Sequence, residues 1–212
     1  MSPAVFLLAR RDPFRCTKRG DCEALVPCPG GIIGDESACP GCGACSSACP
    51  EGTIELIEWP AGPEIGIVVN DERVTVPSRI TVLHAPEILG FTVSRMPGDG
   101  VIFAPCRTGG CWSCTLLVDG RPAPSCVTAV REGMTVETSL PAGSSPLHPL
   151  YGWMGHSVGG VGTPWHLKNA KGYIEAAVFA CGCNLRCPQC QNWTTTYHGK
   201  VHPFPPLRLQ RP

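Results

Sequence analysis

The chain has 212 residues, of which 15 are cysteine, and its 17 basic and 17 acidic side chains give a formal net charge of zero. This balance gives no electrostatic reason to expect a nucleic acid as partner. The 25 glycines and 23 prolines predict many loops and small folded pieces, but they fall short of a disordered composition. No apolar stretch approaches the length of a membrane span.

The cysteine content favours metal ligands over disulfide bonds. Small secreted disulfide domains usually carry an even number of cysteines behind a signal peptide. Here the number is odd, and the apolar run from Ala4 to Ala9 is too short for the core of a signal peptide. We therefore expect a reducing, cytoplasmic setting in which thiolates bind metal.

The first cysteine group contains a spacing that is specific for iron–sulfur sites. Residues 39–56 read CPGCGACSSACPEGTIEL, with the pattern C-x2-C-x2-C-x3-C-P. Three closely spaced thiolates on a tight loop can reach three corners of a cubane cluster, while the cysteine before Pro50 points toward another cluster. A zinc site is the alternative, although zinc needs only four ligands and the C-P ending adds nothing to it.

Together with the earlier half-motif CTKRGDCEALVPCPGGII, residues 14–57 resemble bacterial-type ferredoxins. The resemblance implies two pseudo-symmetric halves and one 4Fe-4S cluster, whose ligands would be Cys28, Cys39, Cys42 and Cys45. It leaves Cys16, Cys22 and Cys49 for a second site. That site fits a 3Fe-4S cluster, as in seven-iron ferredoxins, or a 4Fe-4S cluster completed by a group such as Asp21.

The first half departs from the ferredoxin pattern, because five residues rather than three separate Cys22 from Cys28. This insertion puts the second cluster in question. If the second cluster does not form, Cys49 would complete a lone cluster with Cys39, Cys42 and Cys45.

The middle of the chain predicts a small mixed sheet with one helix. Residues 65–69 and 73–76 form a hairpin pattern around Asn70-Asp71, and residues 115–118 and 121–127 form another around Asp119-Gly120. A weak helical pattern over residues 81–89 is interrupted by Pro86, and residues 134–138 would add a closing strand.

The second cysteine group lies beside the Asp-Gly hairpin and has the pattern C-x4-C-x2-C with a fourth cysteine after eleven residues. This is the plant-type 2Fe-2S spacing, and a zinc knuckle or free thiols are the alternatives. Residues 65–138 resemble the β-grasp 2Fe-2S domains of the xanthine dehydrogenase and succinate dehydrogenase families, with Trp112 where those families usually place glycine. The predicted ligands are Cys106, Cys111, Cys114 and Cys126.

The third cysteine group has the pattern C-x3-C-x2-C in CNLRCPQCQNW, residues 183–193. The sequence resembles radical S-adenosylmethionine proteins, especially relatives of pyruvate formate-lyase activating enzyme. The resemblance implies a 4Fe-4S cluster on Cys183, Cys187 and Cys190, with the fourth iron open to S-adenosylmethionine, and a first barrel strand over residues 174–180. A zinc loop with Cys181 as fourth ligand is the alternative.

Only 22 residues follow Cys190, whereas a barrel needs about 200. Three explanations are therefore expected. The barrel lies on a second polypeptide, the chain is a truncated product, or the motif is a relic that holds a cluster for electron transfer. Whether the chain is an enzyme stays open, and no catalytic residue is assigned.

The expected fold class is α+β, in three parts separated by the Pro- and Gly-rich residues 59–63 and 141–146. A 4Fe-4S ferredoxin-type domain would occupy residues 1–61, a β-grasp 2Fe-2S domain residues 62–141, and the opening of a radical S-adenosylmethionine domain residues 142–212. The protein would pass low-potential electrons to the third site, with a redox partner protein or the missing barrel subunit as partner. A pure electron carrier or adaptor subunit is the rival function.

Overall fold

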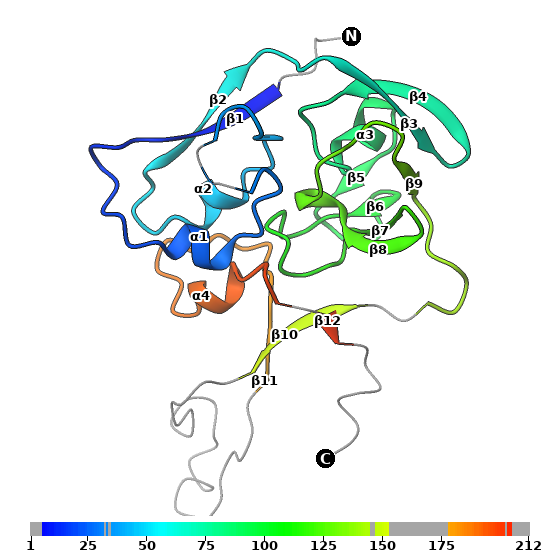
Figure 1. The fold of residues 1–212 in the computed structure, drawn as a ribbon. Helices are drawn as coiled ribbons and strands as arrows, with labels where there is room; N and C mark the ends of the chain where they lie inside the picture. Colours follow the sequence, from blue (N-terminus) through cyan, green and yellow to red (C-terminus); the bar gives the residue numbers. More distant parts are fainter. Residues whose placement is uncertain are drawn as a thin grey trace, which may run out of the picture.

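The computed structural model of the protein describes residues 6–31, 33, 35–144, 147–152, 178–201 and 203–204. The N-terminal region and a sheet-containing middle region lie side by side at the top of Figure 1, and the C-terminal segment lies beneath them. Within the described residues, no helix is long and apolar enough to span a membrane. The predicted small, sheet-rich structure with few helices is confirmed.

The N-terminal region is built around a two-stranded ribbon. Strands β1 (Phe6–Arg11) and β2 (Ile54–Trp59) pair antiparallel, with Phe6 opposite Trp59 and Arg11 opposite Ile54. Two short helices lie between them in the chain, α1 (Asp21–Leu25) and α2 (Ala44–Ala48). The ribbon thus joins the two ends of the segment that carries the first seven cysteines, a pairing that the sequence patterns did not predict.

The second region is a five-stranded mixed sheet in the order β4-β3-β9-β7-β8. Its strands are β3 (Glu64–Val69), β4 (Glu72–Pro77), β7 (Thr115–Val118), β8 (Arg121–Pro124) and β9 (Thr135–Glu137). Both predicted hairpins are confirmed. Their turn residues Asn70, Asp71, Asp119 and Gly120 all have positive φ, as the right-handed twist of a two-residue hairpin requires.

The predicted closing strand is β9, and it lies in the middle of the sheet rather than at its edge. It pairs parallel with β3 and antiparallel with β7. The main apolar core packs on this sheet, and among its members Ile67, Val82 and Val136 are at most 1% exposed. The sheet therefore gives the second cysteine group a rigid, buried support.

Helix α3 (His84–Ile88) is shorter than the predicted helical pattern and carries Pro86 in its first turn, where the missing N–H has no partner to lose. Strands β5 (Val93–Ser94) and β6 (Ile102–Phe103) form a small parallel pair, and a 3₁₀ turn spans Ser125–Val127 after β8. These pieces complete the region that holds the 2Fe-2S-type cysteines.

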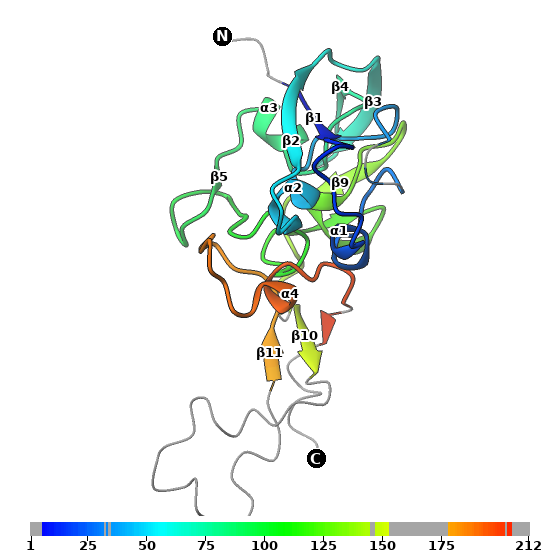
Figure 2. The ribbon, with the colours of Figure 1, turned by 90° about the vertical axis from the view of Figure 1, so that its left-hand side faces the viewer.

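The C-terminal segment adds strands β10 (His148–Gly152), β11 (Val178–Ala180) and β12 (Pro203–Phe204) and helix α4 (Trp193–Thr196). Both ribbon views place α4 directly beneath α1 and α2 (Figures 1 and 2). A strand does precede the third cysteine group as predicted, but β11 pairs antiparallel with β10. Strands of a parallel barrel pair in parallel, so the described residues do not show the start of one. Residues 174–177 of the predicted barrel strand lie outside the described part.

Candidate metal centres

Four cysteines of the N-terminal region line one pocket together with apolar side chains from β1 and the adjoining loops. They are Cys28, Cys39, Cys42 and Cys45. Gly41, with φ 68°, lets the cysteine loop pass close to β1, because a β-carbon on it would lie 2.3 Å from the carbonyl oxygen of Leu7. The structure therefore brings together the four residues that the ferredoxin resemblance groups around one 4Fe-4S cluster.

A second pocket is lined by the remaining three cysteines of this group, Cys16, Cys22 and Cys49. Asp21 also lines it, and its Oδ2 atom is buried beside the Arg19 guanidinium, with 3.0 Å between Nε and Oδ2. Cys49 thus lies with Cys16 and Cys22, away from the pocket of Cys28. The five-residue spacer between Cys22 and Cys28, two residues longer than in the ferredoxin pattern, is accommodated by α1 and its C-terminal end.

The second cysteine group is buried as a whole, at Cys106, Cys111, Cys114 and Cys126. The Sγ atom of Cys106 accepts hydrogen bonds from the backbone N–H groups of Thr108 and Cys111, both at 3.4 Å. The Ser113 N–H donates to Cys111 Sγ at 3.4 Å. Backbone N–H groups aimed at cysteine sulfur are a recognised feature of iron–sulfur loops, because they stabilise the thiolate charge.

The fourth cysteine of this group reaches the loop from beyond the hairpin. Cys126 lies in the 3₁₀ turn after β8, and the neighbouring Ser125 is hydrogen-bonded to the Cys114 carbonyl oxygen through both its hydroxyl, at 2.6 Å, and its N–H, at 3.2 Å. Ser125 is fully buried. The sheet and this serine therefore fix the fourth sulfur against the loop that carries the other three.

The chemistry of these thiols fits a metal cluster. Burial raises the pKa of Cys45 to about 12 and that of Cys42 to about 11. In the second group, a hydrogen bond from the Cys111 thiol and others from Thr108 lower the pKa of Cys106 to about 5. The pKa of Cys111 rises in return, because its thiol donates that bond. Iron binds cysteine as the thiolate, so cluster binding would release the protons of these buried thiols. The positive charge of the iron would then stabilise the thiolate charge in the protein interior.

In the described part of the chain, no three His, Cys, Asp or Glu side chains converge where a single metal ion would fit. The sulfur atoms of the first group instead line the two pockets described above.

The third cysteine group lies on a surface loop between β11 and α4. Cys187 is exposed, while Cys183 and Cys190 are half-buried. The Leu185 N–H donates to Cys183 Sγ at 3.3 Å. Cys181, in contrast to these three, is buried. Its burial is the larger cause, and the charge of Cys106 the smaller one, of a rise in its pKa to about 11.

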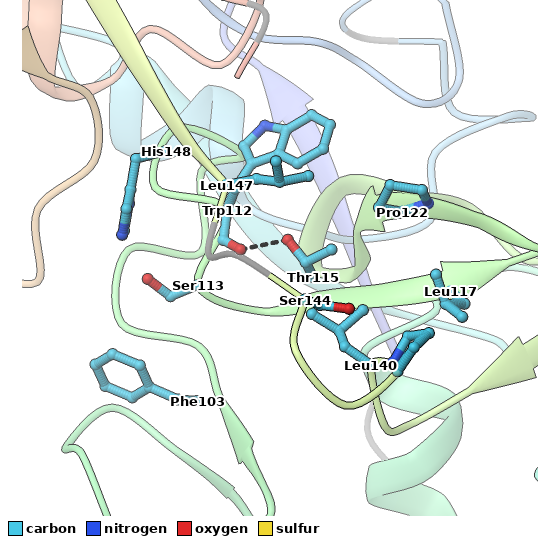
Figure 3. Close-up of a pocket in the computed structure, with 11 residues that line it drawn as sticks. Phe103, Trp112, Ser113, Thr115, Leu117, Pro122, Leu140, Ser144, Leu147 and His148 are labelled. Atoms are coloured by element: carbon cyan, nitrogen blue, oxygen red, sulfur yellow. Dashed lines mark hydrogen bonds between the residues drawn. The ribbon is translucent and has the colours of Figure 1, made fainter. Parts of the chain in front are cut away.

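Sequence patterns missed an apolar pocket of about 720 Å³ beside the second cysteine group. Trp112 and Ser113, from the cysteine loop, line it with Phe103, Leu147 and His148 (Figure 3). Trp112 has φ 58°, the left-handed conformation that explains why glycine suits this position. The one sequence feature that pointed to this pocket was Trp112, which stands where the related 2Fe-2S domains usually place glycine.

Comparisons with known proteins agree with two of the three cysteine groups. Residues 32–55 match the family model of the 4Fe-4S binding domain, and residues 62–141 match that of the 2Fe-2S iron–sulfur cluster binding domain. An uncharacterized iron–sulfur protein of Methanocaldococcus jannaschii is 36% identical over 67 residues, which is 31% of this chain and 13% of the relative. The chain thus matches only a small part of that relative's length.

Both family matches end before Cys183, so they carry no information on the third group. The 4Fe-4S match covers Cys39, Cys42, Cys45 and Cys49 but not the cysteines before residue 32, and the 2Fe-2S match covers all four cysteines of the second group. The chain is therefore an iron–sulfur cluster-binding protein that contains a 4Fe-4S segment and a 2Fe-2S segment.

Proposed function

We propose that this protein transfers electrons between iron–sulfur centres held by its three cysteine groups. Cys28, Cys39, Cys42 and Cys45 would hold a 4Fe-4S cluster, and Cys106, Cys111, Cys114 and Cys126 a 2Fe-2S cluster. Cys16, Cys22 and Cys49 would hold a 3Fe-4S or second 4Fe-4S cluster, and Cys183, Cys187 and Cys190 a further 4Fe-4S cluster. Clusters bound at these positions would supply one-electron chemistry.

The observation that carries the proposal is the direct packing between the first two cluster-binding regions. Pro27, next to Cys28, lies against the 2Fe-2S-type loop, because a β-carbon on Gly109 would be 3.2 Å from Pro27 Cγ. The Pro27 ring therefore packs against the loop backbone at Gly109. Such a short protein path suits electron exchange better than two independent storage sites.

The chain's own residues would set how readily each site accepts an electron. Hydrogen bonds to sulfur and low solvent exposure are two of the main influences on cluster potentials. The 2Fe-2S-type loop has both, whereas Cys16, Cys22 and Cys49 are only half-buried. The two regions therefore offer different electrostatic surroundings along one chain.

A second candidate function is reductive cleavage of S-adenosylmethionine at the third group. The exposure of Cys187 and of Leu185, which is 63% exposed, favours it, since a small molecule could approach this loop. The upstream sites would then supply the electrons. Anaerobic incubation with reductant and S-adenosylmethionine tests this, and 5′-deoxyadenosine is the expected product. Its absence even with candidate barrel subunits present would leave electron transfer alone.

The protein would have three functional parts, at residues 1–61, 62–141 and 142–212. It would act in a cytoplasmic setting and pass electrons to a redox partner protein or to a barrel subunit.

Anaerobic reconstitution, followed by iron and acid-labile sulfide analysis and EPR of the reduced protein, tests the main proposal. Cys28→Ser and Cys126→Ser should each lower the iron content and remove one EPR signal. Cys181→Ser is the matched control, because Cys181 belongs to none of the proposed ligand sets, and it should retain the iron content of the parent. A colourless, zinc-loaded, EPR-silent protein would refute the proposal.

A further inference from the structure

Arg186 lies inside the third cysteine group, between Cys183 and Cys187, and its guanidinium contacts both upstream regions. Its Nη2 donates a hydrogen bond to the carbonyl oxygen of Cys106 at 3.1 Å. Its Nη1 donates to the hydroxyl of Ser47. One side chain therefore connects all three cysteine groups.

Ser47, the N-terminal partner of Arg186, lies between cysteines that line the two sulfur-lined pockets. It belongs to α2, where Cys45 faces the first sulfur-lined pocket, and Cys49 follows the helix and lines the second. The Ser47 hydroxyl also donates to the Gly43 carbonyl oxygen at 3.1 Å, so it is held on the helix. Arg186 thus reaches the element that supplies cysteines to both pockets.

Gly182 provides an independent contact at the start of the same segment. A β-carbon on Gly182 would lie 2.4 Å from Cys111 Cβ and 2.5 Å from Cys111 N. Its own N–H donates to the Thr196 carbonyl oxygen at 3.0 Å, which closes the loop back on α4. The backbone of the third segment therefore packs directly on the 2Fe-2S-type loop.

The far end of the segment touches both regions again. The Gly199 N–H donates to the Leu25 carbonyl oxygen at 2.8 Å, at the end of α1. A β-carbon on Gly199 would lie 2.5 Å from Pro27 Cδ and 2.7 Å from the Thr108 carbonyl oxygen. Contacts at Gly182, Arg186 and Gly199 thus place the third cysteine group where the two upstream regions meet.

We propose that Arg186 is a positioning residue that clamps the third cysteine loop onto both upstream regions, so that the third site shares a boundary with each of them. The planar guanidinium can donate to the Cys106 carbonyl and the Ser47 hydroxyl at once, which a lysine ammonium matches poorly. The inference rests on the proposed function, because it requires the third group to hold an iron–sulfur centre. It makes this site the common neighbour of the others rather than the end of a linear chain.

The full-length protein, reconstituted and reduced with dithionite, allows a direct test by microwave power saturation of the 2Fe-2S EPR signal. A nearby paramagnetic centre speeds relaxation and raises the power needed for half-saturation. Replacing Cys183, Cys187 and Cys190 together by alanine should lower this power several-fold. Arg186→Ala should lower it in the same direction while iron content stays at the parent level, and Arg186→Lys should give an intermediate value.

Two outcomes would overturn the inference. One is an Arg186→Ala protein with full iron and unchanged half-saturation power, and the other is a triple cysteine variant with less iron but unchanged relaxation. If Arg186→Ala fails to hold iron, Ser47→Ala provides the deciding test, since it removes only one of the two contacts of Arg186. A lower half-saturation power in Ser47→Ala supports the clamp, and an unchanged half-saturation power refutes it. An iron-free parent protein would instead refute the proposed function.

Discussion

The two cluster-binding regions bury their cysteines to different degrees. All four cysteines of the 2Fe-2S-type loop are buried, whereas Cys45 alone is buried among the seven of the N-terminal region. The difference follows from the scaffolds. A five-stranded sheet with a packed core supports the 2Fe-2S-type loop. The cysteines of the N-terminal region are supported by a two-stranded ribbon and two five-residue helices. Isolated ribbons and helices this short are marginal in water.

This contrast implies that the two regions depend on their clusters to different extents. The large apolar side chains buried in the described part of the N-terminal region are few: Leu8, Leu25, Val26, Ile33 and Ile54. Its seven cysteines instead line the two pockets. We expect bound iron to hold this region together, while the sheet keeps much of its structure without metal.

Removal of iron should give the largest effect. After anaerobic chelation, hydrogen exchange should show β1, β2 and α2 losing nearly all protection, because their interior loses its central ligands. The backbone amides of β3, β7 and β9 should keep most of theirs. Equal loss in both regions would show that the sheet also depends on its cluster.

A cavity in the sheet core should give the next largest effect. Ile67 on β3 is 1% exposed, so Ile67→Ala should lower the free energy of unfolding by about 2–5 kcal/mol. Urea unfolding followed by circular dichroism would measure it. Ile88, which is 39% exposed on α3, supplies the control. If Ile88→Ala costs as much as Ile67→Ala, the sheet is not the main source of stability.

Substitution of two glycines can separate the contribution of backbone packing to the stability of the N-terminal region from that of backbone strain. Gly41→Ala should cost about 2 kcal/mol or more, because its positive φ is strained and the new methyl meets Leu7 O. Gly52 also has positive φ but has nothing within 4 Å of the added carbon, so Gly52→Ala should cost about 1 kcal/mol. Thermal unfolding of the two holoproteins would compare them. Equal losses would mean that the approach of the cysteine loop to β1 contributes nothing.

A turn carboxylate in the sheet should give the smallest effect. The backbone N–H of Thr135, at 2.9 Å, and then Arg131 lower the pKa of Asp119. Because the pKa is lower in the folded state, the stabilisation is present above the unfolded value of about 4 and disappears as the pH falls through the folded value.

At pH 7, Asp119→Asn, which keeps a residue suited to the positive φ of the turn and removes the charge, should therefore cost about 0.5–1 kcal/mol, since the carboxylate is largely exposed. The difference from the parent in urea unfolding should shrink toward zero in acid. A difference that stays constant with pH would assign the effect to the turn conformation instead of the charge.

Local signals carried most of the correct predictions. Both hairpins were predictable because two-residue turns require positive φ, which Asn, Asp and Gly adopt readily. Cysteine spacing predicted the 2Fe-2S-type loop and the bacterial ferredoxin-type segment, because cluster geometry demands thiolates at short, fixed intervals. The helix around Pro86 was also placed correctly, although its ends were not.

Long-range contacts were beyond the sequence patterns. Nothing local to residues 6–11 shows that they pair with residues 54–59, and nothing in residues 135–137 shows that this strand lies between β3 and β7. The grouping of Cys28 with Cys39 was implied only by resemblance, since spacing alone left Cys49 as an alternative.

The sequence by itself determined that this protein has three groups of closely spaced thiols, because ligand spacing is a local property of the chain; the spacing of each predicts an iron–sulfur site, and family matches reach the first two. Only the tertiary structure decided how the groups meet. It placed Cys49 in a separate pocket from Cys28, and it brought Arg186 to both Ser47 and Cys106. Those contacts join residues far apart in the chain, and their geometry arises only when the ribbon, the sheet and the C-terminal segment pack together.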